Sequence, residues 1–166
     1  MSVLVVGVGD ELGRALVARL VVEGDEVRVI EDRPDAVDGW KRLGAHVAPG
    51  SPDDPDLVER AAQDARTIVV GDGDEAIVSA AIEGARLAGG GGIRIVVVAT
   101  MGPTEHVRAS GGELIVLRTS ASIAATDVAA AVDAADDVEE VPSDELDLTG
   151  PTAWRALRLD PPSYLS

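Results

Sequence analysis

The sequence has no cysteine and no phenylalanine, and aromatic residues make up only 2% of its 166 residues. Without cysteine, neither a disulfide framework nor a thiolate metal site can form. The core must be built mainly from Val, Ile, Leu and Ala, and 46% of the residues are hydrophobic. This composition is typical of a parallel sheet covered by helices. At this length we expect one domain, residues 1–166, with a tail from about residue 151 to 166.

Positive charge and long apolar runs are also scarce. Fourteen basic residues stand against thirty acidic ones, and the resulting formal net charge of -16 repels a nucleic-acid backbone. The longest apolar runs, such as residues 95–99, are far shorter than the roughly 20 residues that span a bilayer. The first residues lack the basic flank and apolar segment of a secretion signal. We therefore expect a cytoplasmic protein that binds neither nucleic acid nor membrane.

Short β-branched runs alternate with segments of helical pattern. The runs cover residues 3–6, 27–30, 46–48, 67–70, 93–99 and 113–117. Repeated βα units predict an α/β, doubly wound, mainly parallel sheet of Rossmann-like type, ordered 3-2-1-4-5-6, with a short extra strand near 145–148. Helices are expected from about residue 11 to Gly24 and over 34–43, 55–62, 74–88, 104–109 and 127–135, the last capped by Thr126. Residues 159–166 are expected to be irregular.

The stretch VVGVGDELGR, residues 5–14, joins the first strand to the first helix. Its glycines are spaced GxGxxxG, one residue longer than the GxGxxG fingerprint of dinucleotide-binding proteins. The candidate phosphate-binding residues are Gly7, Gly9, Asp10, Glu11, Leu12 and Gly13. The alternative is that these glycines only permit close packing of turn, helix and strand.

Asp10 conflicts with phosphate binding. A helix N-terminus attracts anions, but Asp10 can cap it and compete with a pyrophosphate. A carboxylate 4 Å from a phosphate costs about 1 to 4 kcal/mol, or roughly one to three powers of ten in affinity. We therefore expect weak NAD binding, or a site that has lost its cofactor.

Acidic residues also end the second strand, about 20 residues after the turn. There Glu31 and Asp32 can accept hydrogen bonds from an adenosine ribose. A carboxylate at this position favours NAD(H) and repels the 2′-phosphate of NADP(H), while Arg33 softens that preference. The same residues are compatible with a solvated loop.

The sequence GDGDE, residues 71–75, follows the fourth strand at the carboxyl edge of the sheet, where ligands bind. Gly71, Asp72 and Gly73 are therefore candidate binding residues, and Asp74 can cap the next helix. The stretch lacks the twelve-residue loop of a calcium site, so no metal site is predicted.

Two further candidates follow the fifth strand. Thr100 ends it, and His106 lies where a nicotinamide ring would be close. His106 is either a proton-transfer group beside Thr100 or Glu105, or an ordinary surface histidine. His46, beside the third strand, is interpreted as structural.

The segments RIVVVATMGP, DVAAAV and LDLTGP resemble, in order and spacing, those of atypical short-chain dehydrogenase/reductases, the NmrA-like and epimerase-like NAD(P)-binding proteins. The resemblance covers nearly the whole chain. It implies a phosphate loop on Gly7, Asp10 and Gly13, and a polarising hydroxyl at Thr100. The family's catalytic Tyr and Lys, four residues apart, have no counterpart, which argues against ordinary dehydrogenase chemistry.

Three functions remain open. The first is a minimal NAD(P)-binding sensor or accessory protein, and the second is an enzyme that uses Thr100 with His106. The third is a regulatory subunit of an ion transporter, because the first hundred residues also resemble the nucleotide-binding regulatory domains of potassium channels and transporters. We also expect a homodimer that buries part of the C-terminal region, which contains the helix over 127–135 and the tail with Trp154 and Tyr164.

Overall fold

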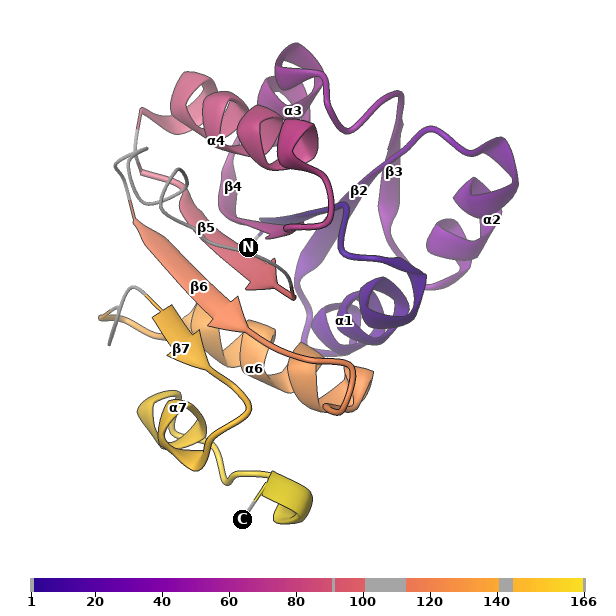
Figure 1. Ribbon diagram of the computed structural model, residues 1–166. Helices are drawn as coiled ribbons and strands as arrows, with labels where there is room; N and C mark the ends of the chain where they lie inside the picture. Colours follow the sequence, from indigo (N-terminus) through magenta and orange to yellow (C-terminus); the bar gives the residue numbers. More distant parts are fainter. Residues whose placement is uncertain (1, 91, 101–112, 141–144, 166) are drawn as a thin grey trace.

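Within the residues that the structure describes, seven strands form one parallel sheet in the order β3-β2-β1-β4-β5-β6-β7 (Figure 1). The structure is a computed structural model, and it describes residues 2–90, 92–100, 113–140 and 145–165. The strands are β1 (Ser2–Val6), β2 (Glu26–Glu31), β3 (His46–Pro49), β4 (Ala65–Gly71), β5 (Arg94–Ala99), β6 (Leu114–Arg118) and β7 (Glu145–Asp147). The predicted α/β fold and strand order are confirmed, and the short extra strand pairs with β6.

Helices cover both faces of the sheet because its central strands are apolar on both sides. In β1, Val3 and Val5 face one apolar layer, while Leu4 and Val6 face the other. Burying such a side chain contributes about 1.5 to 3 kcal/mol, which explains why β-branched runs form the interior. The first layer contains α1 (Asp10–Val22), α2 (Pro34–Arg42), α6 (Ala125–Asp137) and α7 (Pro151–Ala156), and the second contains α3 (Pro55–Ala61) and α4 (Glu75–Gly89).

The helix caps confirm one prediction and overturn another. Asp74 caps α4, because its carboxylate accepts a hydrogen bond of 2.9 Å from the Ala76 N–H. Thr126 does not cap α6, whose N-cap is Ala124. A distant group, the Tyr164 hydroxyl, binds the backbone there by accepting from the Ala124 N–H at 3.2 Å. Local sequence could not reveal this contact. The helix predicted over 104–109 lies outside the described residues.

The C-terminal region packs on the chain's own core. Trp154 in α7 is only 2% exposed, and its indole N–H donates to the Leu148 carbonyl at 2.9 Å. Tyr164 lies in the 3-10 turn η1 (Ser163–Leu165), in a segment predicted to be irregular, and its hydroxyl donates to Asp127 at 2.5 Å. The expectation that Trp154 awaits a second copy is wrong, because α7 buries it within the chain. The homodimer itself stays a prediction.

Among the described helices, none has the length and the apolar character that crossing a membrane requires.

Candidate functional site

The glycine turn lies at the carboxyl edge of the sheet, at the point where the strand order reverses. β1 pairs with both β2 and β4, and the later strands continue outward on the two sides. In open α/β sheets this reversal leaves a crevice in which ligands bind. As predicted, β1 ends at Val6 and a helix follows the turn directly.

The backbone of the turn leaves room for a ligand. Gly7 and Gly9 have φ angles of 63° and 86°, a left-handed region that favours glycine. A Cβ atom built on Gly9 would meet no described residue within 4 Å, so nothing in that part of the chain fills the space above the turn. On the other side, a Cβ on Gly71 would clash with the backbone oxygen of Gly7, so β4 approaches the turn closely only because residue 71 is glycine.

Among the residues that the structure describes, no side chain caps the first turn of α1. Its N-cap is Gly9, so the N–H groups and the positive dipole end face the crevice. The prediction that Asp10 caps this helix is wrong. Its carboxylate accepts two hydrogen bonds from the Arg33 guanidinium, at 2.7 and 3.3 Å. A charge-assisted pair is stronger than a bond to a neutral N–H, which explains why Asp10 turns toward Arg33.

Arg33 also binds Glu31, and the three side chains form what we call the Asp10–Arg33–Glu31 triad. One Glu31 oxygen accepts from the Arg33 guanidinium and from the Trp40 indole, both at 2.9 Å. The other accepts from the backbone N–H and the Nε of Arg33, both at 3.2 Å. These four bonds use the roughly four lone-pair positions of a carboxylate.

The triad is ionised at neutral pH. Burial raises the pKa of Glu31, but the hydrogen bonds from Arg33 and Trp40 outweigh it and hold the pKa at about 2. The hydrogen bond from Arg33 also lowers the pKa of Asp10. Two carboxylates and one guanidinium therefore leave one negative charge beside the turn.

Two cavities flank the glycine turn. The one on the β2 side has a volume of about 370 Å³, and we call it the β2-side cavity. It is lined by residues of the turn, of β1 and β2, and of the segments that follow: Val5, Gly7, Val8, Gly9, Asp10, Val29, Ile30, Glu31, Arg33, Trp40 and Pro52. The triad forms its charged wall.

The second cavity, the β5-side cavity, has a volume of about 860 Å³. Its walls come from the turn, from the ends of β4, β5 and β6, and from the start of α6: Gly7, Val8, Gly9, Asp10, Glu11, Leu12, Gly71, Asp72, Gly73, Val98, Thr100, Thr119, Ser120, Ala121, Ile123, Ala124, Ala125 and Val128. Because the turn lines both cavities, one elongated ligand can occupy both by crossing it.

Polar groups converge in the β5-side cavity. The backbone N–H and the hydroxyl of Thr100 donate to the Asp72 carboxylate at 3.0 and 3.1 Å, which fixes the ends of β4 and β5 against each other. Thr119 is 8% exposed, and its hydroxyl oxygen is buried without a hydrogen-bond partner among the described residues. An unpaired buried hydroxyl is costly, and a polar ligand in the cavity would supply the missing partner.

Most of the predicted site residues meet in these cavities, and two of the described ones do not. Gly13 packs instead of binding, because a Cβ there would lie 2.7 Å from the Trp40 ring. Asp32 is exposed and lines neither cavity. His106 lies outside the described residues. Thr119 and Trp40 were missed, although Thr119 directly follows a strand and the carboxyl-edge rule could have identified it.

The aromatic and basic residues do not form the catalytic pair of ordinary dehydrogenases. Tyr164 is bound to Asp127, and this hydrogen bond raises the pKa of the phenol, whereas a catalytic base needs a lowered one. Lys41 lies near the end of α2 and lines neither cavity. The described residues therefore contain no Tyr–Lys pair at the site.

Comparison with known proteins gives one family match. The TrkA-N domain family matches residues 3–111, which includes the glycine turn and the strands from β1 to β5. This range agrees with the part of the sequence that resembles regulatory domains of channels and transporters. No curated protein sequence matches the chain significantly.

Solved structures share the fold over more of the chain. ChuY, an anaerobillin reductase from Escherichia coli O157:H7, superposes with a TM-score of 0.69 at 17% identity, covering 87% of this chain and 94% of ChuY. A putative NAD-dependent epimerase/dehydratase from Bacillus halodurans gives 0.65 at 18% identity, over 82% and 88% of the two chains. The GsuK channel bound to NAD gives 0.55 at 21% identity, over 67% of this chain and 20% of the channel chain. The predicted resemblance to reductase-like and epimerase-like Rossmann proteins is thus confirmed in the fold.

Proposed function

Because the chain belongs to the TrkA-N domain family, a family of NAD-binding Rossmann domains, we propose that it binds NAD(H) across the glycine turn. The observation that carries this proposal is the pair of cavities that share the turn. The adenosine half occupies the β2-side cavity, the nicotinamide half occupies the β5-side cavity, and the pyrophosphate lies over the N-terminus of α1.

The charge of the β2-side cavity supports NAD(H) over NADP(H). Glu31 is ionised, and it repels a 2′-phosphate. All its hydrogen bonds are already taken by Arg33 and Trp40, so a ribose hydroxyl must displace one of them. This competition, together with the negative charge of the triad, makes binding weak, in the high micromolar range or above.

A nucleotide sensor or accessory protein is the role that fits these features best. The cavities can hold the dinucleotide, but the catalytic pair of ordinary dehydrogenases is missing from the described residues. An enzyme that uses Thr100 is the second candidate, supported by the Thr100 hydroxyl and the unpaired Thr119 hydroxyl in the same cavity. A regulatory subunit of an ion transporter is the third, supported by the family match and by the likeness to the NAD-bound channel.

Titration calorimetry with NAD, NADH, NADP and NADPH tests the binding site. Ala121 is exposed on the wall of the β5-side cavity, so Ala121→Trp fills that cavity without disturbing the core. We expect it to weaken NAD binding at least about tenfold, equivalent to about 1.4 kcal/mol. Leu87→Trp is the control, because Leu87 is 42% exposed near the other end of α4. Native-like binding by Ala121→Trp would show that the ligand lies elsewhere, and no binding of any of the four nucleotides would refute the proposal.

Turnover separates the three roles. Oxidation of NADH with a panel of small carbonyl substrates, lost in Thr100→Ala, would favour the enzyme. Binding without turnover favours the sensor or accessory role. Recovery of the tagged chain together with a membrane transporter would favour the regulatory subunit.

A further inference from the structure

Five carboxylates gather at the amino edge of the sheet, opposite the two cavities. Glu23 and Asp25 follow the end of α1 and precede β2, while Asp133, Asp136 and Asp137 belong to the last turns of α6. The helices α1 and α6 lie on the same face of the sheet, and both begin at the carboxyl edge, so their C-terminal ends meet at the amino edge (Figure 1). The sequence did not reveal this cluster, because its members come from segments far apart in the chain.

The end of α6 has an unusual charge. A helix C-terminus is the negative end of the dipole and normally attracts basic side chains. The last turn of α6 has no basic residue. The Arg94 guanidinium binds the last carbonyl groups of the helix, including those of Ala135 and Val138 at 2.8 and 2.6 Å, and it also pairs with Glu113. Arg94 therefore satisfies carbonyl oxygens, and its ion pair is with Glu113, outside the cluster.

One half of the cluster lies beside Arg66. Its guanidinium binds both oxygens of Asp136, one of them at 3.0 Å, and the Thr67 hydroxyl donates to the same carboxylate at 2.5 Å. Asp25 lies 3.7 Å from the same guanidinium. These two carboxylates thus have a cation beside them.

The other half consists of Glu23, Asp133 and Asp137, and it has too little positive charge. Asp133 is only 4% exposed, and one of its oxygens accepts from Arg19 Nε at 2.8 Å. The other oxygen, Oδ1, is buried with no hydrogen-bond partner among the described residues. Arg19 lies 3.9 Å from Glu23, so a single guanidinium serves both carboxylates. Burying a carboxylate oxygen without a partner is costly, and a bound cation would supply the partner.

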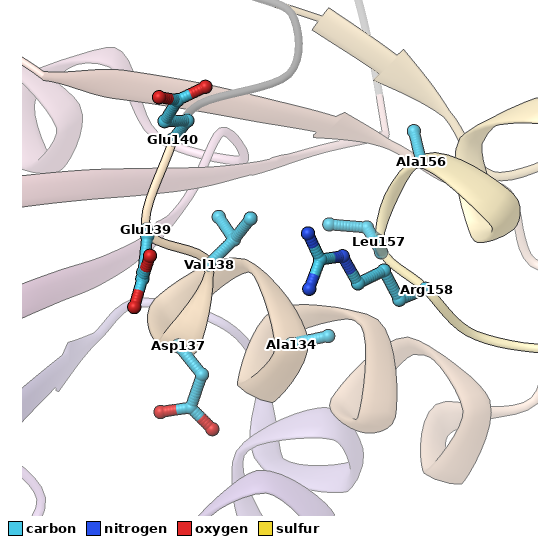
Figure 2. Close-up of a pocket in the computed structure, with 8 residues that line it drawn as sticks. All are labelled: Ala134, Asp137, Val138, Glu139, Glu140, Ala156, Leu157 and Arg158. Atoms are coloured by element: carbon cyan, nitrogen blue, oxygen red, sulfur yellow. The ribbon is translucent and has the colours of Figure 1, made fainter.

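Asp137 completes this half from the end of α6. Asp137 and Arg158 both line a cavity of about 900 Å³ between α6 and α7, and Figure 2 shows the Asp137 side chain pointing away from Arg158. The nearest guanidinium that the structure gives it is Arg66, at 3.6 Å, which already binds Asp136 through two nitrogens. Asp137 is therefore available to another cation.

The three carboxylates lie close enough together to bind one hard cation. One oxygen from each of Glu23, Asp133 and Asp137 lies within 4.8 Å of the other two. Ca²⁺ accepts irregular sets of carboxylate oxygens, whereas Mg²⁺ demands near-ideal octahedral geometry and gives up its water reluctantly, so an irregular set of this kind favours Ca²⁺. Carboxylate oxygens are ligands for hard cations, and neither a thiolate nor an imidazole contributes to this set.

We propose that Glu23, Asp133 and Asp137 bind one Ca²⁺ ion at the amino edge of the sheet. The ion joins the end of α1 to the end of α6, and water completes its coordination. The site is independent of nucleotide binding, because it lies at the opposite edge of the sheet.

Calorimetry with CaCl₂ on chelator-treated protein at pH 7.5 and constant ionic strength tests the site. We expect one ion per chain with a dissociation constant of the order of 10⁻⁴ M, and a higher melting temperature with Ca²⁺. Glu23→Gln and Asp137→Asn change side chains at the surface, so the fold should survive, and each should weaken Ca²⁺ binding at least about tenfold. Glu83→Gln is the matched control, since Glu83 is an exposed helical glutamate paired with Arg86 outside the cluster.

Three results would overturn the proposal. The first is that the native chain binds no Ca²⁺ in the millimolar range, in which case a shared proton between Glu23 and Asp133 accounts for the cluster. The second is that Glu83→Gln weakens Ca²⁺ binding as much as Glu23→Gln does, which would indicate nonspecific attraction to an acidic surface. The third is that Mg²⁺ binds as tightly as Ca²⁺, which would contradict the assignment of the site to Ca²⁺.

Discussion

The Asp10–Arg33–Glu31 triad predicts that two single substitutions change NAD affinity in opposite directions. In Asp10→Asn the side chain keeps its shape but loses its charge. Arg33 stays attached to Glu31 at 2.9 Å, and its remaining N–H groups become available to the pyrophosphate. In Arg33→Gln the guanidinium is lost, and two carboxylates face the ligand without compensation.

The size of the effect follows from distance and exposure. A unit charge 4 Å from a phosphate is worth about 1 kcal/mol in water and about 4 kcal/mol near a protein surface. The side chains of Asp10 and Arg33 are about half exposed, 49% and 51%, so the lower end applies. We therefore expect Asp10→Asn to tighten NAD binding by about fivefold to tenfold and Arg33→Gln to weaken it by a similar factor.

Calorimetry at low salt and at about 0.5 M NaCl measures both effects, and salt should reduce them because exposed charges are screened. Asp38→Asn is the control, since Asp38 is an exposed acid of α2 that lines neither cavity. Unchanged or weaker binding in Asp10→Asn would show that Asp10 does not face the phosphates. The same substitution should change the free energy of unfolding by no more than about 1 kcal/mol, the contribution of a surface ion pair.

Three further predictions concern stability. The pKa of Glu31 is lowered from 4.5 to about 2 in the folded chain, so the stability that its charge provides is present above pH 4.5 and is lost as the pH falls toward 2. In urea unfolding, Glu31→Gln should be less stable than the native chain by at most about 3 kcal/mol at pH 7, and this difference should narrow below pH 4.5. A difference that does not depend on pH would refute the lowered pKa. Gly71→Ala should destabilise the fold by about 1 to 3 kcal/mol because its methyl group meets the Gly7 backbone. Gly73→Ala, whose methyl group meets no described residue within 4 Å, should cost less than about 1 kcal/mol in the same assay. Trp154→Phe should lower the unfolding free energy by about 1 to 3 kcal/mol, because the Leu148 carbonyl loses its buried donor, and native-like stability would mean that water reaches this carbonyl.

The candidate site was predictable where its residues follow strands. Gly71, Asp72 and Thr100 were placed correctly because the carboxyl ends of parallel strands meet at one edge of the sheet. The behaviour of Asp10 was not predictable, because the sequence shows a residue with capping ability and does not show that Arg33 competes for it. Trp154 was misjudged for the same reason, since its burial depends on where α7 packs.

The sequence by itself determined the strands, their order, the glycine turn and the absence of cysteine chemistry. These features depend on local patterns, because β-branched runs require a buried sheet and a left-handed turn requires glycine. The tertiary structure alone decided which charges meet. Asp10 and Arg33 are 23 residues apart, and Arg19 and Asp133 are 114 apart. Such contacts depend on how each helix is rotated and placed against its neighbours. The periodicity of the sequence identifies only the buried face of a helix, so it does not determine the partner of each exposed side chain.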